Sequence, residues 1–218
     1  MIIQKTNARI IWIDIIRGLL LLLICLSHSG SDLPTVKFLI GPTANYWVPL
    51  FFLLSGFLFK NDSQYSYKSY ILKKVQTLLI PYLCFSGLFI LLDWNSYLHP
   101  STITDNLYKV FIVGNGPFKA SPLWFVMVLF ISSICIYPII KIASKTYCIL
   151  LIATISSGIS LFLSIYKIEL PLLIHLAPPA ITYMLTGYCL KKWLTEFSPK
   201  LYSLKYLSIL LIISLWGG

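Results

Sequence analysis

The stretch Ile10–Leu26, IIWIDIIRGLLLLLICL, decides the class of this protein. It is almost continuously apolar, and its length lies within the range of about 17–25 residues with which a helix crosses a bilayer. Similar runs recur along the chain, in which 58% of the residues are hydrophobic and 11% are charged. In a soluble domain about a quarter of the residues are charged. These values and the mean hydropathy of +0.84 exclude an ordinary soluble domain and indicate a protein dissolved in lipid.

The first apolar run has two possible origins, a secretory signal peptide and a membrane helix. Lys5 and Arg9 precede it and small residues follow it, as in a signal peptide. However, the run is longer than a usual signal-peptide core, and Asp14 and Arg17 interrupt it. We therefore expect a first helix that is retained.

We expect an all-α, polytopic transmembrane helix bundle of about seven spans. The apolar runs place these spans at about Ile10–Ser29, Tyr46–Phe59, Val75–Leu92, Pro122–Ile140, Tyr147–Tyr166 and Leu172–Leu190, and from Leu201 to the C-terminus. The second span is short and can extend back over Ile40–Asn45. The connection Asp93–Ser121 contains an apolar run, Leu107–Val113, that is too short to span and fits a surface-lying or re-entrant element.

The net charge of +10 is distributed as in a membrane protein rather than in a nucleic-acid-binding one. With the N-terminus in the cytoplasm, twelve Lys and Arg residues fall in the inner segments and four in the outer loops. The inner segments are Met1–Arg9, Lys60–Lys74, Lys141–Thr146 and Lys191–Lys205, and the outer residues are Lys37, Lys109, Lys119 and Lys167. Because cytoplasmic loops carry the excess of basic residues, we expect a cytoplasmic N-terminus and no nucleic-acid partner.

The five cysteines fall inside or at the ends of apolar segments, without CxxC or Cys/His ligand spacing. We interpret them as small membrane-buried side chains and expect neither a disulfide nor a metal site.

Helix one contains three ionisable residues, Asp14, Arg17 and His28. Asp14 and Arg17 are spaced i, i+3, so they can pair on one face. His28 follows Arg17 by eleven residues, about three turns, which puts both on that face about 16 Å apart. A topology anchor and an interfacial histidine are the alternative interpretations. Since charged groups in a membrane face the bundle interior or a polar cavity, we expect this stripe to face inward.

Two stretches of helix one, Arg9–Gly18 and Leu26–Ser29, resemble the opening helix of the acyltransferase 3 family. The family hallmark is a basic residue, ten intervening residues and a histidine, matched here by Arg17 and His28. Later stretches resemble further family motifs in the same order: Val48–Phe57 in the second helix, Lys73–Tyr82 at the start of the third, Pro122–Phe125 at the start of the fourth and Gly187–Tyr188 near a later helix end.

The family consists of membrane-bound O-acyltransferases that modify sugars of bacterial surface polysaccharides and related glycans. The resemblance implies transfer of an acyl group, most often acetyl, from cytoplasmic acetyl-CoA to a sugar hydroxyl on the outer side. It also implies a location in the bacterial cytoplasmic membrane. The implied partners are membrane lipid, the acyl-CoA donor and a glycan or lipid-linked sugar, with no tightly bound cofactor.

The resemblance also implies roles for the polar stripe. His28 would be the general base, because a positioned imidazole can remove the proton of an attacking hydroxyl. Asp14 would orient Arg17, whose guanidinium suits the phosphates of CoA or a developing oxyanion. Lys73 and Lys74 are further candidates for CoA phosphates, with ordinary topology charge as the alternative.

Two residues are candidates for the sugar site. Trp124 could line it, with an interfacial anchor as the alternative. Ser55 could contribute a polar group, with close helix packing beside Gly56 as the alternative.

The chain departs from the family pattern in two ways. Thr77 stands where the family usually has a second basic residue, three positions after the first. The family domain has about ten helices, whereas this chain ends in the expected seventh, at Leu215–Gly218. We therefore expect residues 1–218 to form a single domain of this family that is incomplete at its C-terminus. A carrier of lipid-linked sugar and an inactive truncated remnant are the alternative functions.

Overall fold

The computed structural model describes residues 11–28, 44–60, 66–92, 100–114, 123–143 and 145–197, and all regular structure in these ranges is helical. The α-helices are α1 (Ile11–His28), α3 (Ala44–Phe57), α4 (Tyr67–Lys74), α5 (Ile80–Leu92), α6 (Pro100–Tyr108), α7 (Trp124–Ile142), α8 (Thr146–Ile165) and α9 (Ala177–Phe197). Two π-helical segments, η1 (Val75–Leu79) and η3 (Lys109–Val113), and a 3-10 segment, η5 (Pro171–Leu176), extend or join them. The prediction of an all-α membrane bundle is confirmed.

Three helices among the described residues are long and apolar enough to cross a membrane: Tyr67–Leu91, Trp124–Ile142 and Thr146–Ile165. A fourth apolar helix, Tyr46–Phe57, is shorter. Half of the span in α7 is buried inside the protein, whereas most of the other two spans is exposed. Apolar side chains on such exposed faces are expected to contact lipid. Six of the seven expected spans coincide with described helices, and the seventh, from Leu201, lies outside the described residues.

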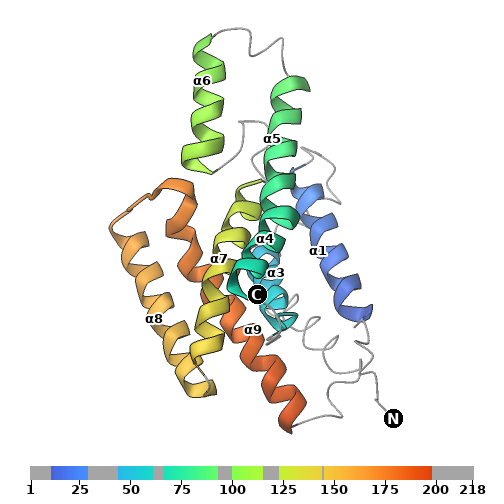
Figure 1. Ribbon diagram of the computed structural model, residues 1–218, viewed down its shortest axis with the longest axis vertical. Helices are drawn as coiled ribbons and strands as arrows, with labels where there is room; N and C mark the ends of the chain where they lie inside the picture. Colours follow the sequence, from blue (N-terminus) through green and yellow to red (C-terminus); the bar gives the residue numbers. More distant parts are fainter. Residues whose placement is uncertain are drawn as a thin grey trace.

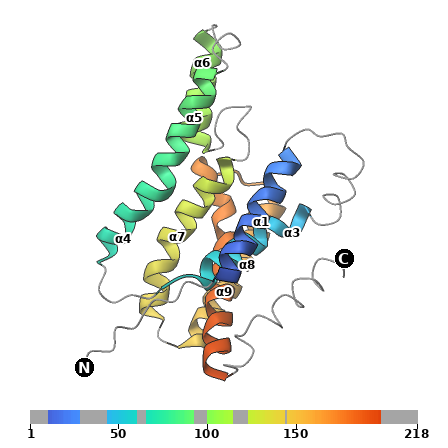
Figure 2. The ribbon, with the colours of Figure 1, turned by 90° about the vertical axis from the view of Figure 1, so that its right-hand side faces the viewer.

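Helix α9 is the centre of the bundle and contacts α3, α7 and α8. Helix α1 packs against α3. Helices α1 and α8 lie on opposite sides of the bundle (Figure 1). Helices α5 and α6 extend beyond the other helices at one end (Figure 2). The opposite end holds the C-terminal ends of α7 and α9 and the start of α8. Lys141, Lys145 and Lys191, from two segments expected to face the cytoplasm, therefore lie toward this end.

Helices α3 and α9 cross closely at two glycines, Gly56 and Gly187. A Cβ atom on Gly56 would overlap the backbone carbonyl of Met184, and one on Gly187 would overlap that of Leu53. Small residues let membrane helices approach closely, which increases their van der Waals contact. The interpretation of Gly56 as a packing residue is therefore correct.

The third span begins earlier than predicted, at Tyr67 rather than Val75. Ser66 caps this helix by accepting a hydrogen bond from the Ser69 N–H at 3.2 Å. Helix α4 is polar, so its hydropathy did not reveal it; tertiary contacts of its tyrosines with α7 stabilise it instead. It runs into π-helical η1, where the Ile80 N–H bonds to the carbonyl of Val75. This wider turn precedes Pro81, which has no N–H to donate.

The tyrosines of α4 compensate for a proline in α7. Pro138 leaves the carbonyl of Ile134, four residues earlier, without its helical donor. The Tyr67 hydroxyl donates to that carbonyl at 3.3 Å, and the Tyr70 hydroxyl donates to the carbonyl of Ser133 at 3.2 Å. Helix α4 is therefore docked where α7 lacks a hydrogen bond of its own.

The sixth span was predicted at Leu172–Leu190, but α9 begins at Ala177 and continues to Phe197. Pro178 and Pro179 lie in its first turn, where a missing N–H costs no helical hydrogen bond. Before it, Leu172 and Leu173 have φ values of 54° and 56°, so η5 is a kinked connection rather than part of the span. The helix continues through Lys191 because Leu194, one turn later, is buried in the core.

Replacing Gly187 with Ala should lower the stability of the bundle by at least about 1–3 kcal/mol, because overpacking here meets backbone rather than a movable side chain. The melting temperature measures the effect. It is obtained by heating the detergent-solubilised protein and monitoring the fraction that remains folded by size-exclusion chromatography. Gly158→Ala is the matched control, since nothing lies within 4 Å of the point that its added methyl group would occupy. Equal melting temperatures for Gly187→Ala and Gly158→Ala would contradict the close crossing.

Replacing Tyr67 with Phe should cost about 0.5–1.5 kcal/mol of stability, since the Ile134 carbonyl loses its donor. In a Pro138→Ala background the loss should shrink, because residue 138 then supplies the helical N–H. The double-mutant cycle is read from thermal unfolding, with Tyr147→Phe on exposed α8 surface as control. A loss that is the same in both backgrounds would show that the two features are independent.

Candidate functional site

Arg17 lies on the face of α1 that packs into the bundle. Ile13 and Leu20, one turn before and after it, are buried at 0% and 4% exposure. Leu19 and Leu22, on the other faces, are more than half exposed. Helix α1 thus has one exposed apolar face, suited to lipid, and one buried face that packs against α3. The residues of each face recur with the 3.6-residue period of a helix. The prediction that the charged part of this stripe faces inward is confirmed for Arg17.

The guanidinium of Arg17 lies over an aromatic ring of α3. Its Cζ atom is 5.0 Å from the centroid of the Phe51 ring, within range of a cation–π interaction. Its Nε atom is buried and has no hydrogen-bond partner among the residues that the structure describes. Asp14, one turn earlier, attracts it electrostatically. Because a buried donor without a partner costs free energy, this Nε is a candidate to bind an anionic ligand.

Two adjacent lysines at the junction of α4 and η1 lie in different surroundings. Lys74 is partly buried, its Nζ is 5.4 Å from the centroid of the Tyr70 ring, and the charge of Arg17 acts on it. Lys73 is exposed. The positive charges of Arg17 on α1 and Lys74 on α4 thus act on each other. Of the two candidate lysines, Lys74 is partly buried and Lys73 is exposed.

Thr77 and Ser55 use their hydroxyl protons within their own helices. The Thr77 hydroxyl donates to the Lys73 carbonyl at 2.8 Å, so the residue in place of the family's second basic residue is a local helix contact. The Ser55 hydroxyl donates to the Phe51 carbonyl at 2.8 Å. Ser55 therefore lies one turn from the ring under Arg17, but its proton is already used.

Trp124 is connected to Arg17 through a series of packed aromatic rings. The Trp124 and Phe125 ring centroids are 6.4 Å apart, and those of Phe125 and Phe51 are 4.8 Å apart with an interplanar angle of 85°. Edge-to-face geometry of this kind is favourable for aromatic pairs. The first residues of α7 are thereby held against the α3 surface that carries the guanidinium.

His28 is the last residue of α1. Because α1 is one continuous helix, His28 lies about 16 Å along the axis from Arg17. The side chain of His28 is outside the described part of the structure. The helix therefore supports the predicted spacing, and the direction of the imidazole stays a prediction.

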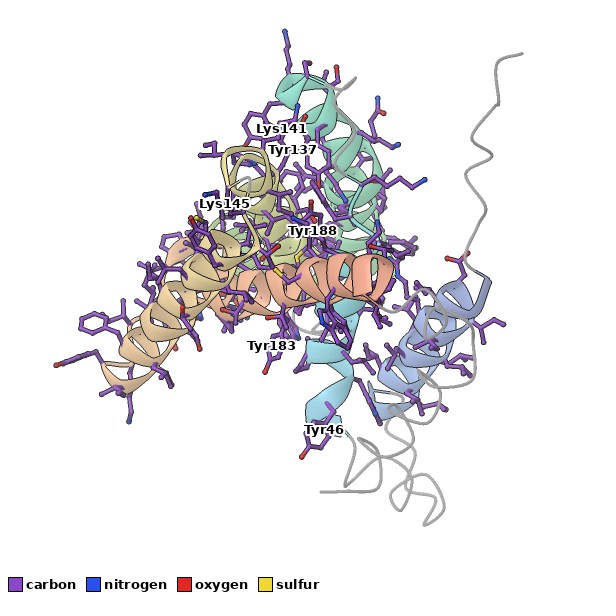
Figure 3. All side chains as sticks on the ribbon, turned by 90° about the horizontal axis from the view of Figure 1, so that it is seen from below. Tyr46, Tyr137, Lys141, Lys145, Tyr183 and Tyr188 are labelled. Atoms are coloured by element: carbon purple, nitrogen blue, oxygen red, sulfur yellow. The ribbon has the colours of Figure 1, made fainter. Side chains whose placement is uncertain are left out.

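An aromatic and basic cluster at the lysine-rich end was missed from the sequence. Tyr137 of α7 packs against Tyr67 and Tyr70, with centroid distances of 5.4 and 4.5 Å, and Lys141 lies 5.0 Å from its ring (Figure 3). Lys141 had been interpreted only as topology charge. The spacing of Tyr137 and Lys141, i and i+4, was a usable signal, but no local pattern shows which tyrosines reach α7.

A small cavity of about 200 Å³ lies beside this cluster. Its lining consists of Phe59, Tyr188, Lys191, Lys192 and Thr195. The Lys191 ammonium donates to the Phe59 carbonyl at 3.1 Å. This bond ties the segment after α3 to the last turns of α9, so Lys191 is occupied by a structural contact.

The chain matches a family model in the comparisons with known proteins. The family model described as an acyltransferase domain matches residues 10–218, almost the whole sequence. No curated protein and no solved structure matches the chain. The inward-facing Arg17 and the glycine crossing of α3 and α9 both lie in stretches that resemble the family motifs. The chain is a membrane protein that belongs to the acyltransferase 3 family.

Proposed function

We propose that this acyltransferase moves an acetyl group from acetyl-CoA to a sugar hydroxyl of a surface polysaccharide or lipid-linked glycan. The observation that carries the proposal is the pair of partly buried cations, Arg17 and Lys74, together with the Arg17 Nε, which lacks a hydrogen-bond partner within the described ranges. Two cations near one another repel, and a phosphate between them would relieve that repulsion. A CoA donor carries several phosphates and fits this requirement.

The orientation follows from the lysine-rich end of the bundle. Arg17 and Lys74 belong to the half of the protein that the positive-inside rule assigns to the cytoplasm, where acetyl-CoA is found. His28 ends α1 at the opposite side. In this proposal the protein lies in the bacterial cytoplasmic membrane with a cytoplasmic N-terminus, and the glycan is modified on the outer side.

The chemistry divides between the two ends of α1. The sugar oxygen attacks the thioester carbonyl carbon while His28 takes the hydroxyl proton. The carbon–sulfur bond then breaks, and the CoA thiolate leaves and takes up a proton. Arg17 and Lys74 hold the donor phosphates, and Asp14 orients the guanidinium. Since about 16 Å separates Arg17 from His28, a long donor must extend between them, or the acyl group must be relayed through the membrane.

Lys73 and the two sugar-site candidates have smaller roles in this proposal. Lys73 is exposed and contributes general positive charge at the donor side. Trp124 is partly buried and continues the aromatic series from Phe51 and Phe125, so it can line the path to the sugar. Ser55 retains only acceptor capacity beside that path.

Replacing Arg17 with Lys should weaken CoA binding about tenfold, because Lys retains the charge but lacks the planar fork that binds phosphate in two places. Lys74→Met should weaken it similarly, and the exposed Lys73→Met much less. Isothermal titration of purified protein with desulfo-CoA measures these affinities. If Lys73→Met and Lys74→Met have equal effects, the phosphate site does not involve the pair described.

Expression of the chain in a strain lacking its gene should restore acetyl groups on the surface polysaccharide, and His28→Ala should not, because the general base is lost. Acetyl content is measured by NMR of the extracted polysaccharide, at equal membrane levels of each variant. The matched control is His99→Ala, in a loop expected on the outer side. A chain that restores nothing is an incomplete or inactive form, and a His28→Ala variant with full activity would overturn the assigned base.

A further inference from the structure

A second cavity, of about 390 Å³, lies between the end of α8 and the start of α9. Five polar side chains line it: Ser160, Ser164, Lys167, Glu169 and His175. Apolar side chains, among them Leu163 and Leu176, complete the wall. Because α8 and α1 lie on opposite sides of the bundle (Figure 1), this cavity is separate from the Arg17 region.

The cavity lies at the end of a candidate membrane span, where lipid head groups are expected. Helix α8 is a candidate membrane span, and its exposed side chains include Leu161, Phe162 and Ile165, at 63%, 53% and 74% exposure. Lys167 and Glu169 follow directly after this helix. A lipid whose chains cover the apolar face of α8 therefore has its head group next to the cavity.

The cavity contains opposite charges that do not neutralise each other. Lys167 and Glu169 are two residues apart and both line it, yet neither forms an ion pair within the part of the chain that the structure describes. Nδ1 of His175 lies 3.1 Å from the backbone N and 3.3 Å from the carbonyl oxygen of Leu170, so this ring nitrogen is used by the backbone and Nε2 is the ring atom left for a ligand. Serine hydroxyls one turn apart on α8 add further donors. A ligand with a negative and a positive group satisfies this set better than an anion alone.

The backbone around the cavity contains three non-glycine residues in the left-handed region. Lys167 has a φ of 50°, in the left-handed region that non-glycine residues rarely adopt, and η5 contains two more such residues, Leu172 and Leu173. Such a conformation is unfavourable for a residue with a side chain and persists where the surroundings impose it. Two hydrogen bonds close the turn, from the Lys167 N–H to the Ser164 carbonyl and from the Ile168 N–H to the Leu163 carbonyl. The charged side chains thus project from a defined turn.

We propose that this cavity binds the head group of a zwitterionic phospholipid, with the phosphate on Lys167, His175 and the serines and the ammonium on Glu169. The same phosphate–ammonium chemistry occurs in free phosphoethanolamine, but the lipid-facing surface of α8 favours the membrane lipid as its source. Bound there, the lipid would join the end of α8 to η5. This inference does not depend on the acyl transfer proposed above.

Native mass spectrometry of the detergent-solubilised chain tests the proposal with two lipids of matched acyl chains. Phosphatidylethanolamine should remain bound about tenfold more tightly than phosphatidylglycerol, which lacks the ammonium group. Glu169→Gln should remove this preference, and Lys167→Met should weaken binding of both lipids. Lys145→Met, at the other end of α8, is the matched control and should change neither. The comparison of the two lipids uses the wild-type chain alone, so its outcome does not depend on whether a variant folds.

Three results would overturn the proposal. Equal retention of both lipids by the wild-type chain would show that the cavity does not recognise a zwitterion. Binding of soluble phosphoethanolamine as tight as that of the lipid would show that the membrane is not its source. Displacement of phosphatidylethanolamine by a neutral oligosaccharide, maltoheptaose, would assign the cavity to a glycan instead.

Discussion

The crossing of α3 and α9 at Gly56 and Gly187 is the constraint on which the rest of the bundle depends. The two backbones approach so closely that a methyl group at either position would meet a carbonyl of the other helix. In a membrane, where lipid is as apolar as the helix surface, such contact supplies much of the association free energy. With α9 held against α3, its other sides contact α7 and α8. Because α1 packs against α3, the crossing also sets where α1 lies relative to α9.

The candidate site follows from this arrangement through Phe51. The ring of Phe51 lies on α3, one turn before the glycine crossing, and supports the guanidinium of Arg17 on one side and the ring of Phe125 on another. Helix α4 approaches from a third direction because Tyr67 and Tyr70 bond to the carbonyls near Pro138. Lys74 ends this docked helix, and the charge of Arg17 acts on it. Two sets of aromatic contacts therefore position the two cations: Phe51 with Phe125, and the α4 tyrosines with Tyr137.

Much of the fold was predictable because lipid exposure leaves a strong signal in composition. Helices α1, α7 and α8 begin and end within two residues of the predicted spans. The predicted bounds were wrong where a helix includes polar residues. Hydropathy did not reveal the polar helix α4, and it did not predict that α9 continues past Lys191. In both cases, the helix is stabilised by contacts between segments distant in sequence, such as Tyr67 with Ile134. A hydropathy window, which considers only neighbours in sequence, does not contain that information.

By itself, the sequence determined that this is a helical membrane protein, and its motifs identified the family, with Arg17 and His28 at the characteristic spacing. Both follow from local properties, namely the apolar length that spans a bilayer and the order of residues along one helix. Only the tertiary structure decided that Lys74 is partly buried while Lys73 is exposed, and that Lys167 and Glu169 line one cavity. These outcomes depend on the rotation and crossing of packed helices, which are set by contacts between distant residues rather than by the pattern of any single helix.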